Sequence, residues 1–97
     1  MFVHAGMLEL VPEVTAEQQQ YVIDGFGELE GRIDGLVQVE VCRDLGLSED
    51  NAQLLCLLSF QDQLSWQRYR DHPAHQALIA ERIAPVLRSK SFVQYER

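Results

Sequence analysis

The chain has 97 residues, enough for one domain and too few for two, so we expect a single domain over residues 1–97. Its net charge of -7, from fifteen acidic and eight basic residues, argues against nucleic acid or an anionic membrane surface as a partner, because both require a basic face. No apolar run approaches the roughly 20 residues of a membrane-spanning helix, and the N-terminus lacks the basic and apolar regions of a signal peptide. We therefore expect a cytoplasmic protein.

The first third of the chain predicts a strand followed by a helix. Residues 2–11 form a mostly apolar run that is typical of a strand and places His4 on one face with Leu8 and Leu10. Residues 15–18 match a capping box, which marks the start of a helix. That helix carries an apolar stripe with spacings of four, three and four residues, formed by Val22, Phe26, Leu29 and Ile33.

The rest of the chain predicts two more strands, a helical region and a closing strand. Residues 36–42 alternate apolar and polar, residues 53–60 are nearly all apolar, and residues 44–51 form the loop between them. A helical region follows over about 62–87, and residues 92–95 form a short closing strand. This order is the ferredoxin-like split β-α-β pattern of an α+β fold, in which both helices cover one face of a four-stranded antiparallel sheet.

The other face of this sheet is predicted to be apolar. Soluble monomers rarely leave such a large apolar patch exposed. We therefore expect a homodimer in which two copies pack sheet against sheet through this open face. The residues assigned to it are Val3, Ala5 and Met7, then Val37, Val39 and Val41, then Leu55 and Leu57.

Cys42 and Cys56 both fall in predicted strands, and neither has a metal-ligand spacing. We expect both thiols to be reduced, unpaired and packed as small apolar side chains. A reactive or paired thiol is the alternative.

The segment over residues 69–75, YRDHPAH, holds most of the candidate chemistry. Pro73 cannot continue a helix but is favoured as the first residue of a new one, so we expect the helix to break here, with one of the two preceding residues as the cap. The break frees Tyr69 to turn toward the space that His75 occupies. The first-turn position of His75 favours a neutral imidazole, because the helix dipole disfavours a cation there.

If the strand face that carries His4 packs under the helices, then His4, Tyr69 and His75 line one cavity. Two imidazoles and a phenol suffice to abstract a proton beside a carbonyl and to polarise that carbonyl. Each residue also has a structural interpretation: a core histidine, an aromatic wedge and a first-turn surface residue, with His72 as a helix cap. The spacing of His72 and His75 suits a metal on a helix, but no third ligand is evident, and we expect no metal and no cofactor.

The sequence resembles the stress-responsive dimeric α/β-barrel (Dabb) family over essentially its whole length. The most specific part is the Tyr-x-x-His-Pro-x-His core of residues 69–75, supported by residues 1–4, 12–18, 35–43 and 92–96. The resemblance implies a dimeric α+β barrel, in a family described through stress response and mostly without assigned activity. We therefore predict a stress-responsive barrel protein that binds a small, partly apolar ligand between helices and sheet.

The same family includes a plant polyketide cyclase, which closes a linear polyketide by an aldol reaction. The resemblance thus implies, as an alternative, a cyclase or isomerase with His75 as the base, and antibiotic monooxygenases of the same architecture suggest a cofactor-free monooxygenase as a further alternative. A purely structural dimer is the remaining interpretation. Ala5 and Gly6 replace bulky aliphatic residues of the family's first strand, which implies a pocket of different shape. The cyclase's catalytic positions correspond here to His75, Tyr69 and His4, its pocket positions to Val22, Phe26 and Leu78, and His72 is a further candidate for substrate contact.

Overall fold

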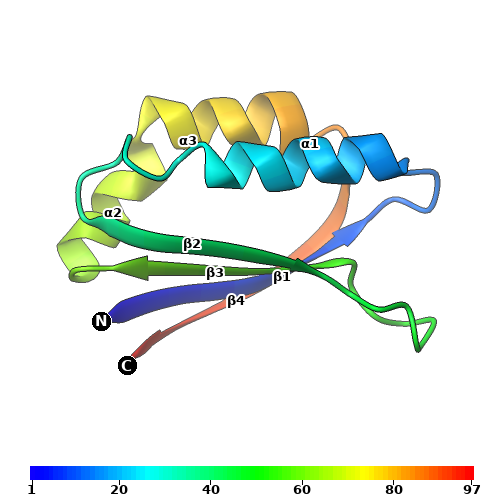
Figure 1. The fold of residues 1–97 in the computed structure, drawn as a ribbon, viewed down its shortest axis with the longest axis horizontal. Helices are drawn as coiled ribbons and strands as arrows, with labels where there is room; N and C mark the ends of the chain where they lie inside the picture. Colours follow the sequence, from blue (N-terminus) through cyan, green and yellow to red (C-terminus); the bar gives the residue numbers. More distant parts are fainter.

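In the computed structural model, which describes residues 1–97, the sheet has the strand order β2-β3-β1-β4, and every neighbouring pair is antiparallel (Figure 1). The predicted ferredoxin-like α+β fold is therefore confirmed. None of the helices combines the length and the apolar character needed to cross a bilayer. In chain order the elements are β1 (Phe2–Leu10), α1 (Ala16–Gly27), β2 (Leu36–Arg43), β3 (Leu54–Phe60), α2 (Gln63–Asp71), α3 (Pro73–Leu78), the π-helical turn η1 (Ile79–Ile83) and β4 (Leu87–Glu96).

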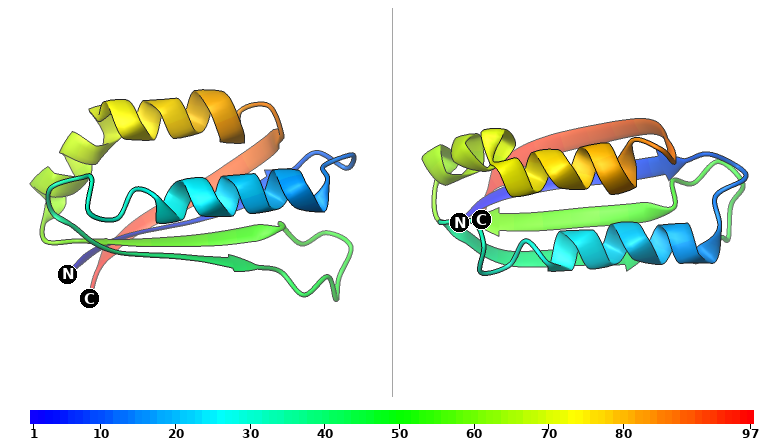
Figure 2. Two further views of the ribbon diagram at one scale, coloured as in Figure 1. Left: turned by 45° about the horizontal axis from the view of Figure 1, so that its top comes forward. Right: turned by 90° about the horizontal axis from the view of Figure 1, so that it is seen from above.

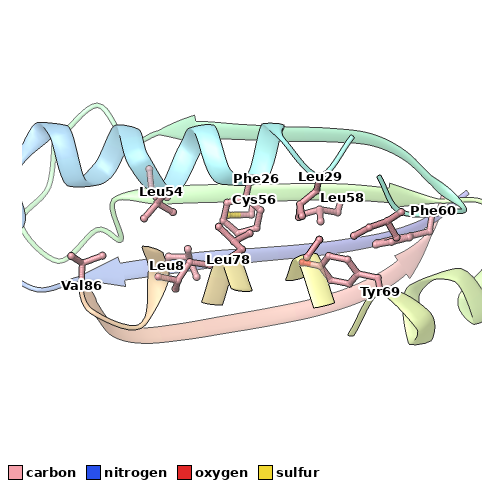
Figure 3. Packing of buried hydrophobic residues seen from close by; sticks show 14 of the residues in the cluster. Leu8, Phe26, Leu29, Leu54, Cys56, Leu58, Phe60, Tyr69, Leu78 and Val86 are labelled. Atoms are coloured by element: carbon pink, nitrogen blue, oxygen red, sulfur yellow. The ribbon is translucent and has the colours of Figure 1, made fainter. Parts of the chain in front are cut away.

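The helices lie on one face of the sheet, with α1 above β2 and β3 and the α3–η1 segment above β1 and β4 (Figure 2). Sixteen buried residues fill the space between the two layers, and Figure 3 draws fourteen of them. Gly25 weakens α1 as an isolated helix, but it allows close packing, since a β-carbon there would collide with Leu78 of α3 and Arg82 of η1. Tertiary packing therefore decides the position of α1.

Helix α1 begins where the capping box predicts. The Thr15 hydroxyl accepts from the Gln18 backbone at 3.1 Å, and the Gln18 side chain accepts from the Thr15 backbone at 2.9 Å. The helix ends at Gly27, before the predicted stripe is complete. Leu29 and Ile33 are nevertheless buried, in the turns that follow the helix. The stripe thus identified core residues correctly but extended the helix too far.

The predicted break at Pro73 is also confirmed. Helix α2 ends at Asp71, and His72 adopts an extended conformation with φ -68° and ψ 135°. Nδ1 of His72 accepts a hydrogen bond of 3.0 Å from the backbone N–H of Ala74, so His72 is the N-cap of α3. After this change of direction α3 lies over the β1–β4 side of the sheet, whereas α2 lies at the end of the sheet (Figures 1 and 2).

The predicted faces of β2 are wrong for Val39 and Val41, which pack against the core from the helix side. The register shifts between Leu36 and Gln38, where Val37 is the extra residue of a β-bulge. One extra residue moves every later side chain to the opposite face. The open face is therefore made of Val3, Ala5 and Met7 from β1, Gln38, Glu40 and Cys42 from β2, Leu55, Leu57 and Ser59 from β3, and Ser91, Val93 and Tyr95 from β4.

Strand β4 begins at Leu87, five residues earlier than the predicted closing strand. Residues 88–91 are polar and gave no strand signal, yet residues 89–91 pair with β1 at the edge of the sheet, where polar side chains remain in water.

The two cysteines lie on opposite faces of the sheet, since Cys56 pairs with Val41 in a helix-facing row, whereas Cys42 pairs with Leu55 in an open-face row. Their sulfur atoms therefore cannot form an intramolecular disulfide. Cys56 is buried, and burial raises the pKa of its thiol to about 12. Cys42 is exposed, so the prediction of a packed apolar side chain holds only for Cys56.

Candidate functional site

A cavity of about 370 Å³ lies between the helical segment α2–α3–η1 and the strands β1 and β4. We call it the β1–β4 cavity. Nine of its fourteen lining residues are hydrophobic, and His4, Tyr69 and His75 all contribute to its wall. The fold thus brings together three side chains that are as many as 71 positions apart in the sequence. A larger and more open hollow of about 700 Å³ lies by the loop between β2 and β3, but it contains no histidine or tyrosine.

His4 projects from the helix-facing side of β1, opposite Gln94 of β4. The Gln94 amide donates from Nε2 to Nδ1 of His4 at 2.9 Å, and the imidazole stacks on the Phe92 ring with centroids 4.6 Å apart. An amide NH₂ group only donates, so Nδ1 of His4 must be the accepting nitrogen. Neutral His4 therefore carries its proton on Nε2, which makes Nε2–H a hydrogen-bond donor.

His75 and Tyr69 face each other across the break between α2 and α3. Their rings stack with centroids 4.0 Å apart, and the Tyr69 ring lies 6.3 Å from the His4 ring. Nδ1 of His75 is 3.2 Å from the carbonyl oxygen of Arg70. Because a carbonyl only accepts, Nδ1 carries the proton, and Nε2 of His75 is left as the proton-accepting nitrogen.

Both histidines are neutral near pH 7. Burial, and secondly the neighbouring cationic groups, lower the pKa of His4 to about 4. Burial also lowers the pKa of His75, although its hydrogen bond to the Arg70 carbonyl opposes the shift. Lys90 and Arg70 contribute to the lowering of both values. His75 is therefore neutral as expected, but the main cause is its burial and not the helix dipole.

Tyr69 is only 2% exposed, and burial raises the pKa of its phenol, so the hydroxyl keeps its proton and remains a donor. Trp66 also lines the cavity, and its indole N–H is buried without a hydrogen-bond partner. An unpaired buried N–H costs about 1–3 kcal/mol. The cavity wall therefore combines one residue with a proton-accepting nitrogen, His75, with two residues that carry donors, Tyr69 and His4.

The four other predicted positions are placed differently. Phe26 lines the β1–β4 cavity, whereas Val22 and Leu78 are buried in the core and do not contribute to its wall. His72 also lies outside the lining, because its side chain is engaged in capping α3. Contact between a ligand and these residues stays a prediction.

Several lining residues escaped the sequence analysis, namely Trp66, Arg70, Ile79, Ile83, Leu87, Lys90, Phe92 and Gln94. Three of them had a signal in the sequence: Lys90, Phe92 and Gln94 alternate, which places them on one face of a strand. That signal was missed because the strand was expected to begin only at Phe92. The rotation of α2, which directs Trp66 and Arg70 to the cavity, follows from packing and has no local signature.

The lowered pKa of His4 predicts how stability depends on pH. The unfolded chain protonates this histidine at about pH 6.5, whereas the folded chain does so only near pH 4. Between these values the unfolded state binds more protons, so the free energy of unfolding falls as the pH is lowered from about 7 toward 4. Urea denaturation over this range measures the slope. His4→Gln should reduce the slope without removing it, because His75 shifts in the same direction; an unchanged slope would refute the assignment to His4.

Comparison with known proteins agrees with the fold. The sequence model of one protein family, the stress responsive A/B barrel domain (Dabb), matches residues 2–96. A comparison with curated proteins gave no match. A dimeric ferredoxin-like protein of unknown function from Thermobifida fusca is 29% identical, with a TM-score of 0.85 over 97% of this chain and 88% of that chain.

Two more distant structures share the fold. A Dabb family protein with a ferredoxin-like fold from Mesorhizobium loti is 24% identical, with a TM-score of 0.78 over 99% of this chain and 95% of that chain. A hydroxynitrile lyase from Passiflora edulis is 14% identical, with a TM-score of 0.79 over 97% of this chain and 90% of that chain. Because the family model spans all but the first and last residues, the chain belongs to the stress-responsive A/B barrel (Dabb) family.

Proposed function

We propose that this protein is a cytoplasmic, stress-responsive barrel protein that binds a small, partly apolar ligand in the β1–β4 cavity. The observation that supports the proposal is that Tyr69, His4, His75 and Trp66 all line one mostly apolar cavity. An apolar wall with a few converging polar groups is typical of small-molecule sites, and about 370 Å³ lies within their usual range of volumes. A ligand carbonyl oxygen would satisfy the donors, and its apolar body would cover the hydrophobic wall.

We further propose that two copies form a homodimer through the open face. In the single chain two apolar side chains of this face are largely exposed, Met7 at 50% and Val93 at 62%. Leu55, on the central strand β3, is exposed as well. The solved relatives from Thermobifida fusca and Bacteroides fragilis are described as dimeric. Packing two such sheets face to face would remove the apolar patch from water and form a barrel.

A second candidate function is catalysis of the aldol-cyclase or isomerase type. The observation that favours it is the tautomer of His75, whose Nδ1–H is bound to the Arg70 carbonyl, so that Nε2 is free to accept a proton. In this reaction Nε2 would take a proton from the carbon beside a carbonyl, while Tyr69 and His4 donate to the carbonyl oxygen as negative charge develops there.

The single tryptophan of the chain is Trp66, in the cavity wall, so its fluorescence reports ligand binding directly. We expect 4-phenylbutan-2-one, a neutral ketone with an apolar body, to perturb this fluorescence in a saturable manner. Tyr69→Phe removes only the hydroxyl, and the loss of one hydrogen bond of about 1 kcal/mol should weaken binding about fivefold. Tyr21→Phe, an exposed tyrosine on α1 outside the lining, is the matched control. Equal affinity of the Tyr69 variant and the wild type would contradict the assigned donor.

A further inference from the structure

The charged side chains that line the β1–β4 cavity are positive, whereas the chain as a whole is negative. The protein carries a net charge of -7 and fifteen carboxylates, yet no aspartate or glutamate lines this cavity. Two cationic side chains do, Arg70 and Lys90, and Lys90 is the only lysine of the sequence. The cavity is therefore a positively charged site in an acidic protein.

The fold directs both cations to this place. Lys90 pairs with Leu8 on the helix-facing side of β4, at the edge of the sheet. Arg70 follows Tyr69 on α2, and its guanidinium carbon lies 5.2 Å from the centre of the Trp66 ring. Both positive charges act on the two histidines of the site, which places the histidines within the field of both.

Neither cation is neutralised by the protein. The three ion pairs of the structure join Met1 to Glu96, Arg82 to Glu28 and Arg88 to Glu9, and none includes Arg70 or Lys90. Glu9 lines the neighbouring hollow together with Lys90, but its carboxylate lies 3.9 Å from Arg88 and accepts a hydrogen bond from Ser89. Two unpaired cations beside a mostly apolar wall suit a ligand with one anionic end.

We propose that the β1–β4 cavity selects a small amphipathic carboxylate, whose anionic group lies between Lys90 and Arg70. Its apolar body would cover Leu8, Phe26, Ile83 and Leu87 in the remainder of the wall. Arg70 and Lys90 are both exposed, so water and salt weaken their attraction for an anion, but a charge-assisted hydrogen bond to a carboxylate is still stronger than a neutral one to a ketone. This inference rests on the proposed function, because it names the ligand class of the same cavity.

The test uses two ligands of nearly equal shape, 3-phenylpropanoate and 4-phenylbutan-2-one, which differ in that an anionic oxygen replaces a methyl group. Titration of Trp66 fluorescence at neutral pH and low salt gives both dissociation constants. We expect the carboxylate to bind about tenfold more tightly than the ketone, and added salt to reduce the difference. Lys90→Gln should reduce the preference to threefold or less, whereas Arg68→Gln, an exposed cation of α2 outside the lining, should leave it unchanged.

The possible outcomes separate the two proposals. Ketone binding equal to or tighter than carboxylate binding would overturn the anion preference and leave the ligand-binding function standing. The anion preference would equally be overturned if Lys90→Gln, shown to be folded by circular dichroism, kept the full preference. If neither ligand changed the fluorescence of Trp66, both proposals would fail.

Discussion

Replacing Leu57 with aspartate is expected to convert the homodimer into a monomer. Leu57 lies on β3 in the middle of the open face, between Ala5 of β1 and Glu40 of β2. An unpaired charge buried at an interface costs about 3–5 kcal/mol, and a two-fold dimer would bury two of them, beside two copies of Glu40. The dissociation constant should therefore rise by about three orders of magnitude or more.

Light scattering or sedimentation at micromolar concentration measures this change directly. Leu64→Asp is the matched control, because Leu64 is 52% exposed on α2, on the opposite side of the sheet. That variant should remain dimeric. A dimeric Leu57→Asp protein, or a wild-type protein that is monomeric at these concentrations, would contradict sheet-to-sheet pairing.

The second large effect is expected from Gly6→Ala. Gly6 pairs with Phe92, whose ring packs against the glycine, so a β-carbon at this position would overlap the ring. Phe92 in turn stacks on His4, so its displacement would disturb the wall of the cavity. Overpacking of this kind costs about 1–3 kcal/mol. The variant should lose that much stability in urea denaturation and should also bind 4-phenylbutan-2-one at least about tenfold more weakly.

Gly27→Ala provides the control for this prediction. Gly27 is the last residue of α1, and a β-carbon there would meet no other atom within 4 Å. The same substitution should therefore be neutral or raise stability by about 0.4–1 kcal/mol, because alanine restricts the unfolded chain. If Gly6→Ala were as well tolerated as Gly27→Ala, the close packing of Phe92 on β1 would not be important for the site.

Local chemistry explains which parts of the fold the sequence could predict. The capping pair at Thr15 and the break at Pro73 depend on a few neighbouring atoms, and both were predicted. The bulge at Val37 depends on the pairing of β2 with β3. No local pattern marks it, so the strand faces after it were assigned wrongly. The helix-facing sides of β1 and β3 contain no such shift and were correct.

In the candidate site, too, the residues with a local signal were predictable and those placed by long-range packing were not. His4 was placed by simple alternation along β1, and His75 and Tyr69 were placed by the proline break. Trp66 and Lys90 were missed for different reasons. The direction of Trp66 depends on how α2 packs on the sheet, whereas Lys90 lies in a polar stretch that becomes a strand only because β1 supplies its hydrogen-bond partners.

A crystal structure of the complex with 4-phenylbutan-2-one would show whether the β1–β4 cavity binds a small ligand through His4, Tyr69, His75 and Trp66. We expect the aromatic ring of the ketone to lie against the apolar wall. Its oxygen should lie about 3 Å from at least one of two donors, the Tyr69 hydroxyl or Nε2 of His4. A ketone found on the open face or in the hollow beside the β2–β3 loop, with the β1–β4 cavity empty, would contradict the proposed site.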